Sequence, residues 1–168
     1  MSLLFVLGGA RSGKSRYALT RAEALPGALL FVATAQALDK EMDSRIARHR
    51  EERGPRWCTI EEPFDLAGVV RTEARADRVL LIDCLTLWAS NLLLADRDID
   101  AATVALVGAL GEPQGPVILV ANEVGLGIVP DNALARRFRD VAGIINQAVA
   151  ACANEAVFMA AGLPMRLK

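Results

Sequence analysis

The chain has 168 residues, and this length predicts one domain over residues 1–168 with a core of its own. Its 19 basic and 20 acidic side chains leave a formal net charge of −1, so no overall positive field would attract a nucleic acid or an anionic membrane. The three cysteines are widely spaced without a C-x-x-C pair, which disfavours a disulfide framework or a zinc site and favours a reducing cytoplasm. We expect neither a membrane span nor a signal peptide, because every apolar run is too short.

Five short runs are predicted to be strands buried on both faces, because each is apolar throughout rather than alternating. In chain order they cover residues 3–7, 28–33, 79–83, 116–122 and 156–160. The predicted helices cover residues 14–24, 39–52, 65–75, 85–95, 101–110 and 133–155. This order of elements predicts an α/β fold in which right-handed crossovers build a mostly parallel sheet flanked by helices.

The first predicted strand leads into GGARSGKS, residues 8–15, which satisfies the phosphate-binding pattern G-x-x-x-x-G-K-[ST] between a strand and a helix. Backbone N–H groups of such a loop point at phosphate oxygens, and the next helix presents its positive end to the same anion. We therefore expect a P-loop, RecA-like three-layer fold, in which Lys14 reaches the β- and γ-phosphates and the Ser15 hydroxyl ligates Mg²⁺. The alternative is a glycine-rich turn without a ligand. The nucleotide-binding candidates are Gly8, Gly9, Ala10, Arg11, Ser12, Gly13, Lys14 and Ser15.

A second oxygen ligand for Mg²⁺ is expected at the end of another strand. The apolar run Val79 to Ile82 ends in Asp83, which is the candidate Walker B carboxylate. The alternative is a polar residue that merely terminates a strand. Asn122 and Glu123 begin the loop NEVGLGIVPDN at the carboxyl end of a later apolar strand, where open α/β sheets bind ligands. These two residues are candidates for contacting substrate or metal unless the connection is an ordinary loop.

The only histidine of the chain lies in a basic segment. Residues 45–56 hold five arginines and two glutamates, and on a helix Arg45, His49 and Arg53 share one face. Positive neighbours disfavour the imidazolium form, so His49 would keep a free lone pair, as a nucleophile toward phosphorus requires. The alternative is a solvated charged helix in which the histidine is incidental.

Five sequence blocks together resemble one known family. They are GGARSGKS (residues 8–15), RIARHR (45–50), DCLTLW (83–88), NEVGLGIVP (122–130) and RFRDVAGIINQ (137–147). In this order and spacing they resemble the bifunctional adenosylcobinamide kinase / adenosylcobinamide-phosphate guanylyltransferases of cobalamin biosynthesis, and the resemblance runs from Gly8 to the terminal AGLPMRLK.

The resemblance implies two reactions. ATP or GTP phosphorylates the hydroxyl of the corrinoid adenosylcobinamide, and GTP then donates GMP to that phosphate, releasing pyrophosphate. His49 would carry the GMP covalently and Lys14 would stabilise the leaving phosphates; Arg48 precedes His49 where some members of the family carry a second histidine. The family's other nucleotide contacts correspond to residues 8–15 and to Ala33, Thr34, Ala35, Arg50, Glu51, Glu52, Arg53, Glu61 and Asp83.

The family resemblance also favours a homo-oligomer, namely a trimer with sites near subunit boundaries. Two other functions remain open from the residues alone. One is a small-molecule kinase that uses the P-loop without guanylyl transfer, and the other is a RecA-like nucleotide-dependent switch that acts on a partner protein. A covalent nucleotide on the protein would separate the bifunctional transferase from both.

Overall fold

The computed structural model describes residues 2–36 and 54–168. Within them, seven strands form one sheet in the order β3-β2-β4-β5-β1-β6-β7, in which every neighbouring pair is parallel except β6 and β7. The strands are β1 (Leu3–Gly8), β2 (Ala28–Ala33), β3 (Trp57–Glu61), β4 (Arg78–Asp83), β5 (Val117–Asn122), β6 (Glu155–Ala160) and β7 (Leu163–Arg166).

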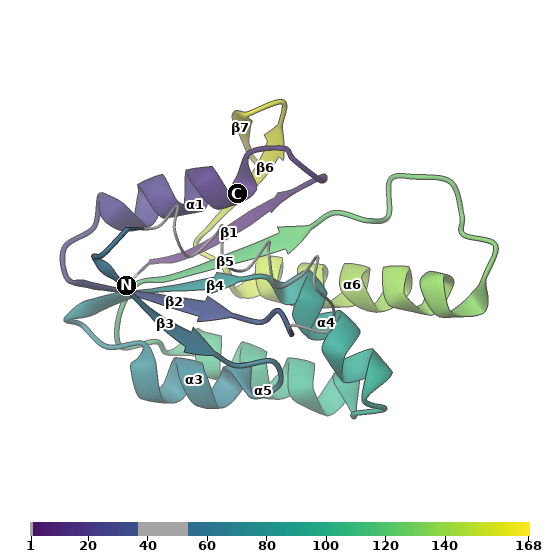
Figure 1. The fold of residues 1–168 in the computed structure, drawn as a ribbon, viewed down its shortest axis with the longest axis horizontal. Helices are drawn as coiled ribbons and strands as arrows, with labels where there is room; N and C mark the ends of the chain where they lie inside the picture. The colour runs from purple at the N-terminus through teal and green to yellow at the C-terminus, as the bar shows by residue number, and fades with distance from the viewer. Residues whose placement is uncertain (1, 37–53) are drawn as a thin grey trace.

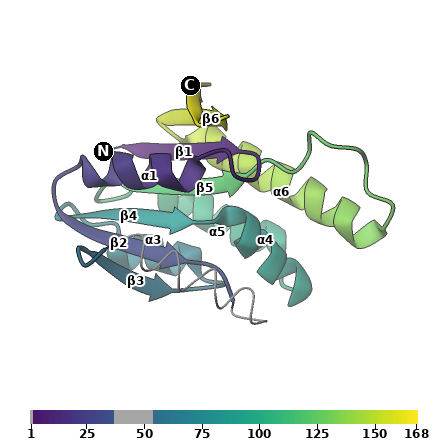
Figure 2. The same cartoon turned by 45° about the horizontal axis from the view of Figure 1, so that its top comes forward.

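Helices cover both faces of this sheet. Figures 1 and 2 show α1 on one face and α3, α5 and α6 on the other. Their bounds are α1 (Lys14–Glu23), α3 (Leu66–Glu73), α4 (Leu85–Leu94), α5 (Ile99–Gly111) and α6 (Ala133–Cys152). The predicted three-layer α/β fold is therefore confirmed. Within the described ranges, no helix is long and apolar enough to cross a membrane.

The core has two parts, one on each face of the sheet. Along β1, Leu3, Phe5 and Leu7 enter the cluster that α3 to α6 cover, whereas Leu4 and Val6 enter the cluster beneath α1. Because successive side chains point to opposite faces, a strand that both layers cover must be apolar throughout. This explains why the five central runs could be recognised from the sequence.

The two edge strands, β3 and β7, were not predicted. The side chains of β3 are mostly not buried, and all four residues of β7 are exposed and include Pro164. Both strands lack the continuous apolar run of a buried strand, because each has a neighbouring strand on only one edge in the part of the chain that the structure describes. The predicted helix over residues 39–52 lies outside the described residues.

Several predicted helix bounds were wrong by a few residues. Helix α5 begins at Ile99 rather than at residue 101, because the side chain of Asp98 caps it by accepting from the N–H of Ala101 at 2.9 Å. Helix α3 begins after Asp65, whose side chain accepts from Gly68 N at 2.8 Å. Helix α6 ends at Cys152, before β6 starts.

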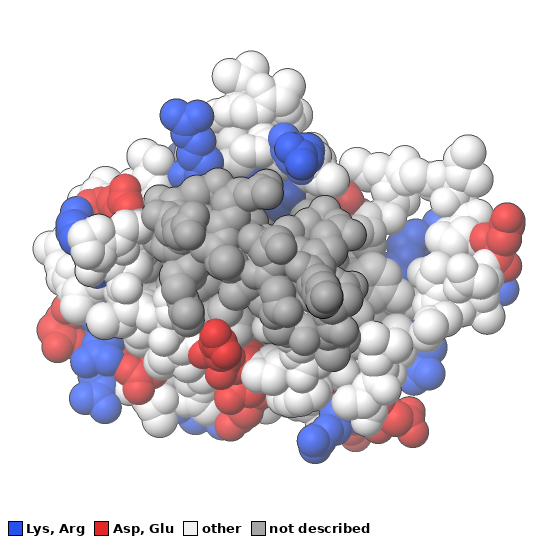
Figure 3. All heavy atoms as spheres, in the orientation of Figure 1, with Lys and Arg blue, Asp and Glu red and all other residues white. Residues whose placement is uncertain are grey.

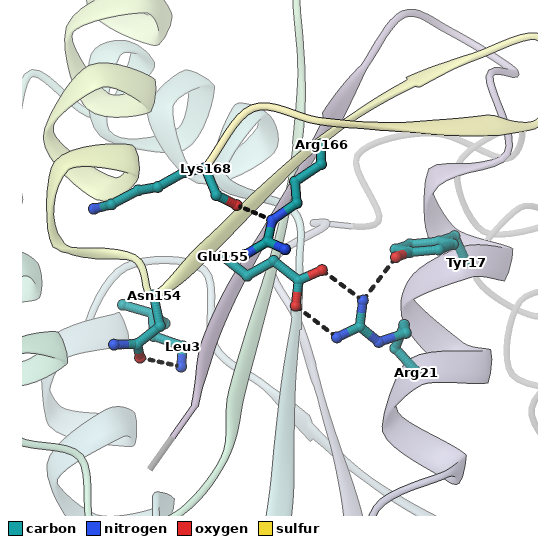
Figure 4. Close-up of polar contacts among 7 residues, drawn as sticks. All are labelled: Leu3, Tyr17, Arg21, Asn154, Glu155, Arg166 and Lys168. Carbon is teal, nitrogen blue, oxygen red and sulfur yellow. Dashed lines mark hydrogen bonds and ion pairs between the residues drawn. The ribbon is translucent and has the colours of Figure 1, made fainter.

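An ion pair fastens α1 to β6 at the amino end of the sheet. Both carboxylate oxygens of Glu155 accept from Arg21, at 2.9 and 2.7 Å, and Arg21 also donates to the Tyr17 hydroxyl at 2.7 Å (Figure 4). The hydrogen-bonded guanidinium holds the pKa of Glu155 below its ordinary value. Beside it, Leu3 N donates to the side chain of Asn154 at 2.8 Å, which fixes the start of β1. These contacts fix α1, and hence the loop that precedes it, relative to the sheet.

Candidate active site

The predicted phosphate-binding loop connects β1 to α1. Its backbone turns through Arg11 and Gly13, with φ of 54° and 94°, and Gly13 is the N-cap of α1. Among the residues that the structure describes, no side chain caps this helix, and its first turn holds no acidic residue. The first N–H groups of a helix need partners from outside the helix and favour an anion. The start of α1 therefore suits a phosphate group.

The loop packs against the turn between β6 and β7. A β-carbon on Gly8 would lie 2.5 Å from the carbonyl oxygen of Met159, and one on Gly13 would lie 3.3 Å from the Cα of Gly162. The N–H of Gly162 also donates to the carbonyl of Ser12 at 3.0 Å. The hairpin of β6 and β7, of which only β6 was predicted, thus packs against the phosphate loop, and Gly8 and Gly13 allow this close approach.

Lys14 lies against its own loop. Its Nζ donates to the carbonyl oxygen of Gly9 at 2.6 Å, and only 7% of the residue is exposed. Burial lowers the pKa of Lys14, while the negative charge of Asp83 opposes that shift. A cation that is poorly hydrated in the free protein gains most from an approaching phosphate. Lys14 therefore has the surroundings expected of a phosphate-binding lysine.

Ser15 and Asp83 are in direct contact. The hydroxyl of Ser15 donates to Oδ2 of Asp83 at 2.7 Å, which joins the start of α1 to the carboxyl end of β4. A hydroxyl and a carboxylate oxygen are ligands that Mg²⁺ prefers. Nearby, the buried Oγ of Ser12 has no hydrogen-bond partner among the described residues, so this loop has polar capacity left for a ligand. The residues present fit a Mg²⁺-nucleotide.

The carboxyl ends of β2, β3 and β4 form the neighbouring part of the site. Ala33 pairs with Glu61 on one side and with Asp83 on the other, so these three predicted residues lie in one row. Glu61 is exposed, as a residue that meets a ligand must be. The structure thus brings the Glu61 and Asp83 carboxylates to the same edge of the sheet as the phosphate loop.

Thr34 joins the end of β2 to the end of β4. Its side chain, fully buried, donates to the carbonyl oxygen of Cys84 and accepts from the N–H of Cys84, both at 2.8 Å. Its backbone N–H donates to Asp83 O at 3.4 Å, and its carbonyl accepts from Asn91 at 2.7 Å. In the segment 33–35, the partly exposed Ala35 is therefore better placed than Thr34 to meet a nucleotide.

Other polar side chains of α4, which the sequence analysis did not single out, support this edge. Asn91 donates to the carbonyls of Thr34 and Pro63, at 2.7 and 3.1 Å, and the hydroxyl of Thr86 accepts from Asn122 N at 2.6 Å. Trp88 is core, and its indole N–H donates to Phe64 O at 2.7 Å. Apart from these two buried residues and Ser90, α4 is apolar, a pattern that could have drawn attention to them.

The predicted nucleophile and its neighbours lie outside the described residues. These are His49, Arg50, Glu51, Glu52 and Arg53. On the face shown in Figure 3, basic and acidic side chains are interspersed.

The fold and the loop together define a P-loop nucleotide-binding α/β protein. The family model for "Cobinamide kinase / cobinamide phosphate guanyltransferase" matches residues 4–167, and the chain belongs to this family. The chain is 52% identical to the bifunctional adenosylcobalamin biosynthesis protein CobP of Pseudomonas aeruginosa, over 97% of this chain and 95% of that protein. It is 40% identical to the bifunctional adenosylcobalamin biosynthesis protein CobU of Escherichia coli, over 99% of both. The resemblance inferred from the five sequence blocks is confirmed.

Proposed function

We propose that this protein phosphorylates adenosylcobinamide with ATP or GTP and then transfers GMP from GTP to the product, giving adenosylcobinamide-GDP and pyrophosphate. The observation that carries the proposal is the Ser15–Asp83 contact beside Lys14 and the uncapped start of α1, in a chain of this family. Both reactions need a site that holds a triphosphate, and the sequence offers one such loop.

In the first reaction, the protein mainly positions the γ-phosphoryl group and neutralises its charge. The Lys14 ammonium and the first N–H groups of α1 would bind the β- and γ-phosphate oxygens. Ser15 and Asp83 would hold Mg²⁺, which when bound supplies further neutralisation of the phosphate charge. The substrate hydroxyl attacks the γ-phosphorus, and the nucleoside diphosphate leaves.

In the second reaction, His49 is the proposed nucleophile. A ring nitrogen of His49 attacks the α-phosphorus of GTP, the bond to the β-phosphate breaks, and pyrophosphate leaves beside Lys14. An oxygen of the adenosylcobinamide phosphate then attacks the same phosphorus and breaks the P–N bond, which returns a neutral imidazole. Residues 8–15 and 33–35, Arg50 to Arg53, Glu61 and Asp83 are the proposed nucleotide contacts.

The test is the intact mass of the protein after incubation with GTP and Mg²⁺. We expect one added GMP that is stable to base and lost in mild acid, as a P–N bond requires. The His49→Ala variant should show no adduct and no GMP transfer but should still phosphorylate adenosylcobinamide, because that step depends on Lys14 and Ser15 instead. An acid-labile adduct that persists in the variant would exclude His49 as the nucleophile. Phosphorylation without any adduct in the wild type would indicate a kinase alone.

We also propose a cytoplasmic homo-oligomer, with a trimer as the favoured state. The connection between β5 and α6 extends away from the sheet (Figure 1), and on it Leu126, Ile128 and Val129 are 81%, 97% and 56% exposed. Apolar side chains grouped in this way favour contact with another chain. A single species of about 18 kDa in sedimentation at micromolar concentration would contradict the proposal.

A further inference from the structure

Strand β5 carries an acidic residue to the phosphate loop. In the sheet, β5 lies between β1, which leads into the loop, and β4, which ends in Asp83. Gly8 at the end of β1 pairs with Asn122, and Asp83 pairs with Val120. Glu123 therefore lies just beyond the sheet, between the first glycine of the loop and the proposed Mg²⁺ ligand, and extends further past the edge than Asp83.

Three hydrogen bonds fix the backbone at this point. The N–H of Glu123 donates to the carbonyl of Gly8 at 3.0 Å. The preceding residue, Asn122, donates through its N–H to Thr86 and accepts at its carbonyl from the side chain of Asn146, at 2.6 and 3.4 Å. Glu123 is thus attached directly to the residue that begins the phosphate loop, and α4 and α6 hold it in place.

Within the described residues, one hydrogen bond orients the carboxylate of Glu123 and occupies only one of its two oxygens. Its Oε1 accepts from the N–H of Gly125 at 2.6 Å, and a β-carbon at residue 125 would come within 2.9 Å of that oxygen. The other oxygen, Oε2, accepts no hydrogen bond from the residues that the structure describes, and the side chain is partly exposed. A carboxylate with one oxygen held and the other accessible suits proton transfer with a substrate.

We propose that Glu123 is a catalytic residue of the phosphorylation step and accepts the proton of the substrate hydroxyl. The inference rests on the proposed function. As the hydroxyl oxygen forms its bond to the γ-phosphorus, the bond from that phosphorus to the β–γ bridging oxygen breaks. The proton of the hydroxyl passes to Oε2 of Glu123, and the electron pair of the broken bond leaves with the nucleoside diphosphate. After product release, the proton returns to water.

The other carboxylates of this edge are less suited to the same task. Asp83 accepts from Ser15 and is the proposed metal ligand. Glu61 ends β3, and three strands separate β3 from β1. Glu123 alone of these three is bonded through its backbone to Gly8.

The test compares both reactions in the full-length Glu123→Gln variant. We expect phosphorylation of adenosylcobinamide to lose about 100-fold or more in kcat, because glutamine has the shape of glutamate but cannot take a proton. GMP transfer to preformed adenosylcobinamide phosphate should stay within about threefold of the wild type, because that substrate brings a phosphate oxygen with no proton to remove. Glu123→Asp should recover part of the lost kcat. Asp131→Asn removes an exposed carboxylate from the same connection and serves as the matched control.

A Glu123→Gln variant that phosphorylates adenosylcobinamide with the kcat of the wild type would overturn the inference. An equal loss of both reactions in a folded variant would also overturn it, because Glu123 would then act on the shared nucleotide site. A wild-type protein that performs neither reaction would instead contradict the proposed function, so the two failures are distinguishable.

Discussion

The hydroxyl of Ser15 donates to Oδ2 of Asp83 over 2.7 Å, although 68 positions separate the two residues in the chain. Ser15 comes from the start of α1 and Asp83 from the end of β4, and strand β5 lies between β4 and the strand that precedes α1. The contact therefore crosses the carboxyl edge of the sheet and places the two proposed metal ligands together. Because either side chain can be replaced while the other remains, their contributions to metal binding can be measured separately.

Asp83→Asn should raise the Mg²⁺ concentration for half-maximal activity by about tenfold or more, because a charged ligand becomes neutral. Ser15→Ala should act in the same direction. The measurement is activity against Mg²⁺ concentration at fixed nucleotide. Asp77→Asn is the control, since Asp77 precedes the same strand at its other end and is exposed. If the curve of Asp83→Asn superimposes on that of the wild type, another carboxylate holds the ion.

Nucleotide binding should take up a proton through Lys14 at alkaline pH. Burial lowers the pKa of Lys14 from its ordinary value of 10.5 in the free protein, and bound phosphate charge would raise it again. Between these two pKa values the free protein is partly deprotonated while the complex is protonated, so affinity should fall as the pH rises through this range. Calorimetry in buffers of different ionisation enthalpy measures the uptake directly.

Lys14→Met should bind nucleotide more weakly and should lose this proton uptake. The variant should also remove a pH dependence of the free energy of unfolding. A lysine whose pKa is lowered by folding destabilises the folded protein at low pH. This destabilisation disappears as the pH rises toward the pKa of the lysine in the unfolded protein. Equal proton uptake by the variant and the wild type would show that another group titrates.

The sequence predicted the centre of the fold better than its edges. Phe5, Ile82 and Leu119 lie on central strands that helices cover on both faces, and their apolar runs are unbroken. The edge strands β3 and β7 are stabilised on one side by a neighbouring strand, so their residues need not be apolar. β3 pairs with β2 and β7 pairs with β6 because the folded chain brings them together, and no local sequence pattern encodes these pairings.

The residues of the candidate site also divide into those that the sequence indicated and those that it did not. The sequence singled out Lys14, Ser15 and Asp83 because phosphate and Mg²⁺ require particular residue types at the ends of strands and helices, and their roles stay predictions. Thr86 and Asn91 act on backbone groups that only the tertiary structure brings to them. Thr34, assigned to nucleotide binding by resemblance, has a further role in joining β2 to β4 that the sequence did not indicate.

Thr34→Val should reduce the free energy of unfolding by about 1–3 kcal/mol, because the buried N–H and C=O of Cys84 would lose their partner while the shape is kept. Thr34→Ser keeps the hydroxyl and should cost about 1 kcal/mol for the lost methyl group. Urea unfolding measures both. A valine variant as stable as the wild type would mean that the two hydrogen bonds contribute nothing.

Gly8→Ala should destabilise the protein and weaken nucleotide binding together. The new β-carbon would meet Met159 O at 2.5 Å and the Ser12 hydroxyl at 2.7 Å, and Gly8 has a φ of 154°, which side chains rarely adopt. Because a backbone carbonyl cannot move aside cheaply, we expect a loss of about 2 kcal/mol or more in the free energy of unfolding. Urea unfolding and calorimetric titration with Mg·GTP measure the two effects.

Gly9→Ala is the matched variant, since a β-carbon there has no atom of residues 2–36 or 54–168 within 4 Å and no positive φ opposes it. Its free energy of unfolding should stay within about 0.5 kcal/mol of the wild type. If Gly9→Ala is stable but binds Mg·GTP weakly, phosphate approaches the backbone at this residue, and Gly9 is needed for the ligand rather than for folding. If Gly8→Ala is as stable as Gly9→Ala, the close packing of the β6–β7 turn does not hold the phosphate loop.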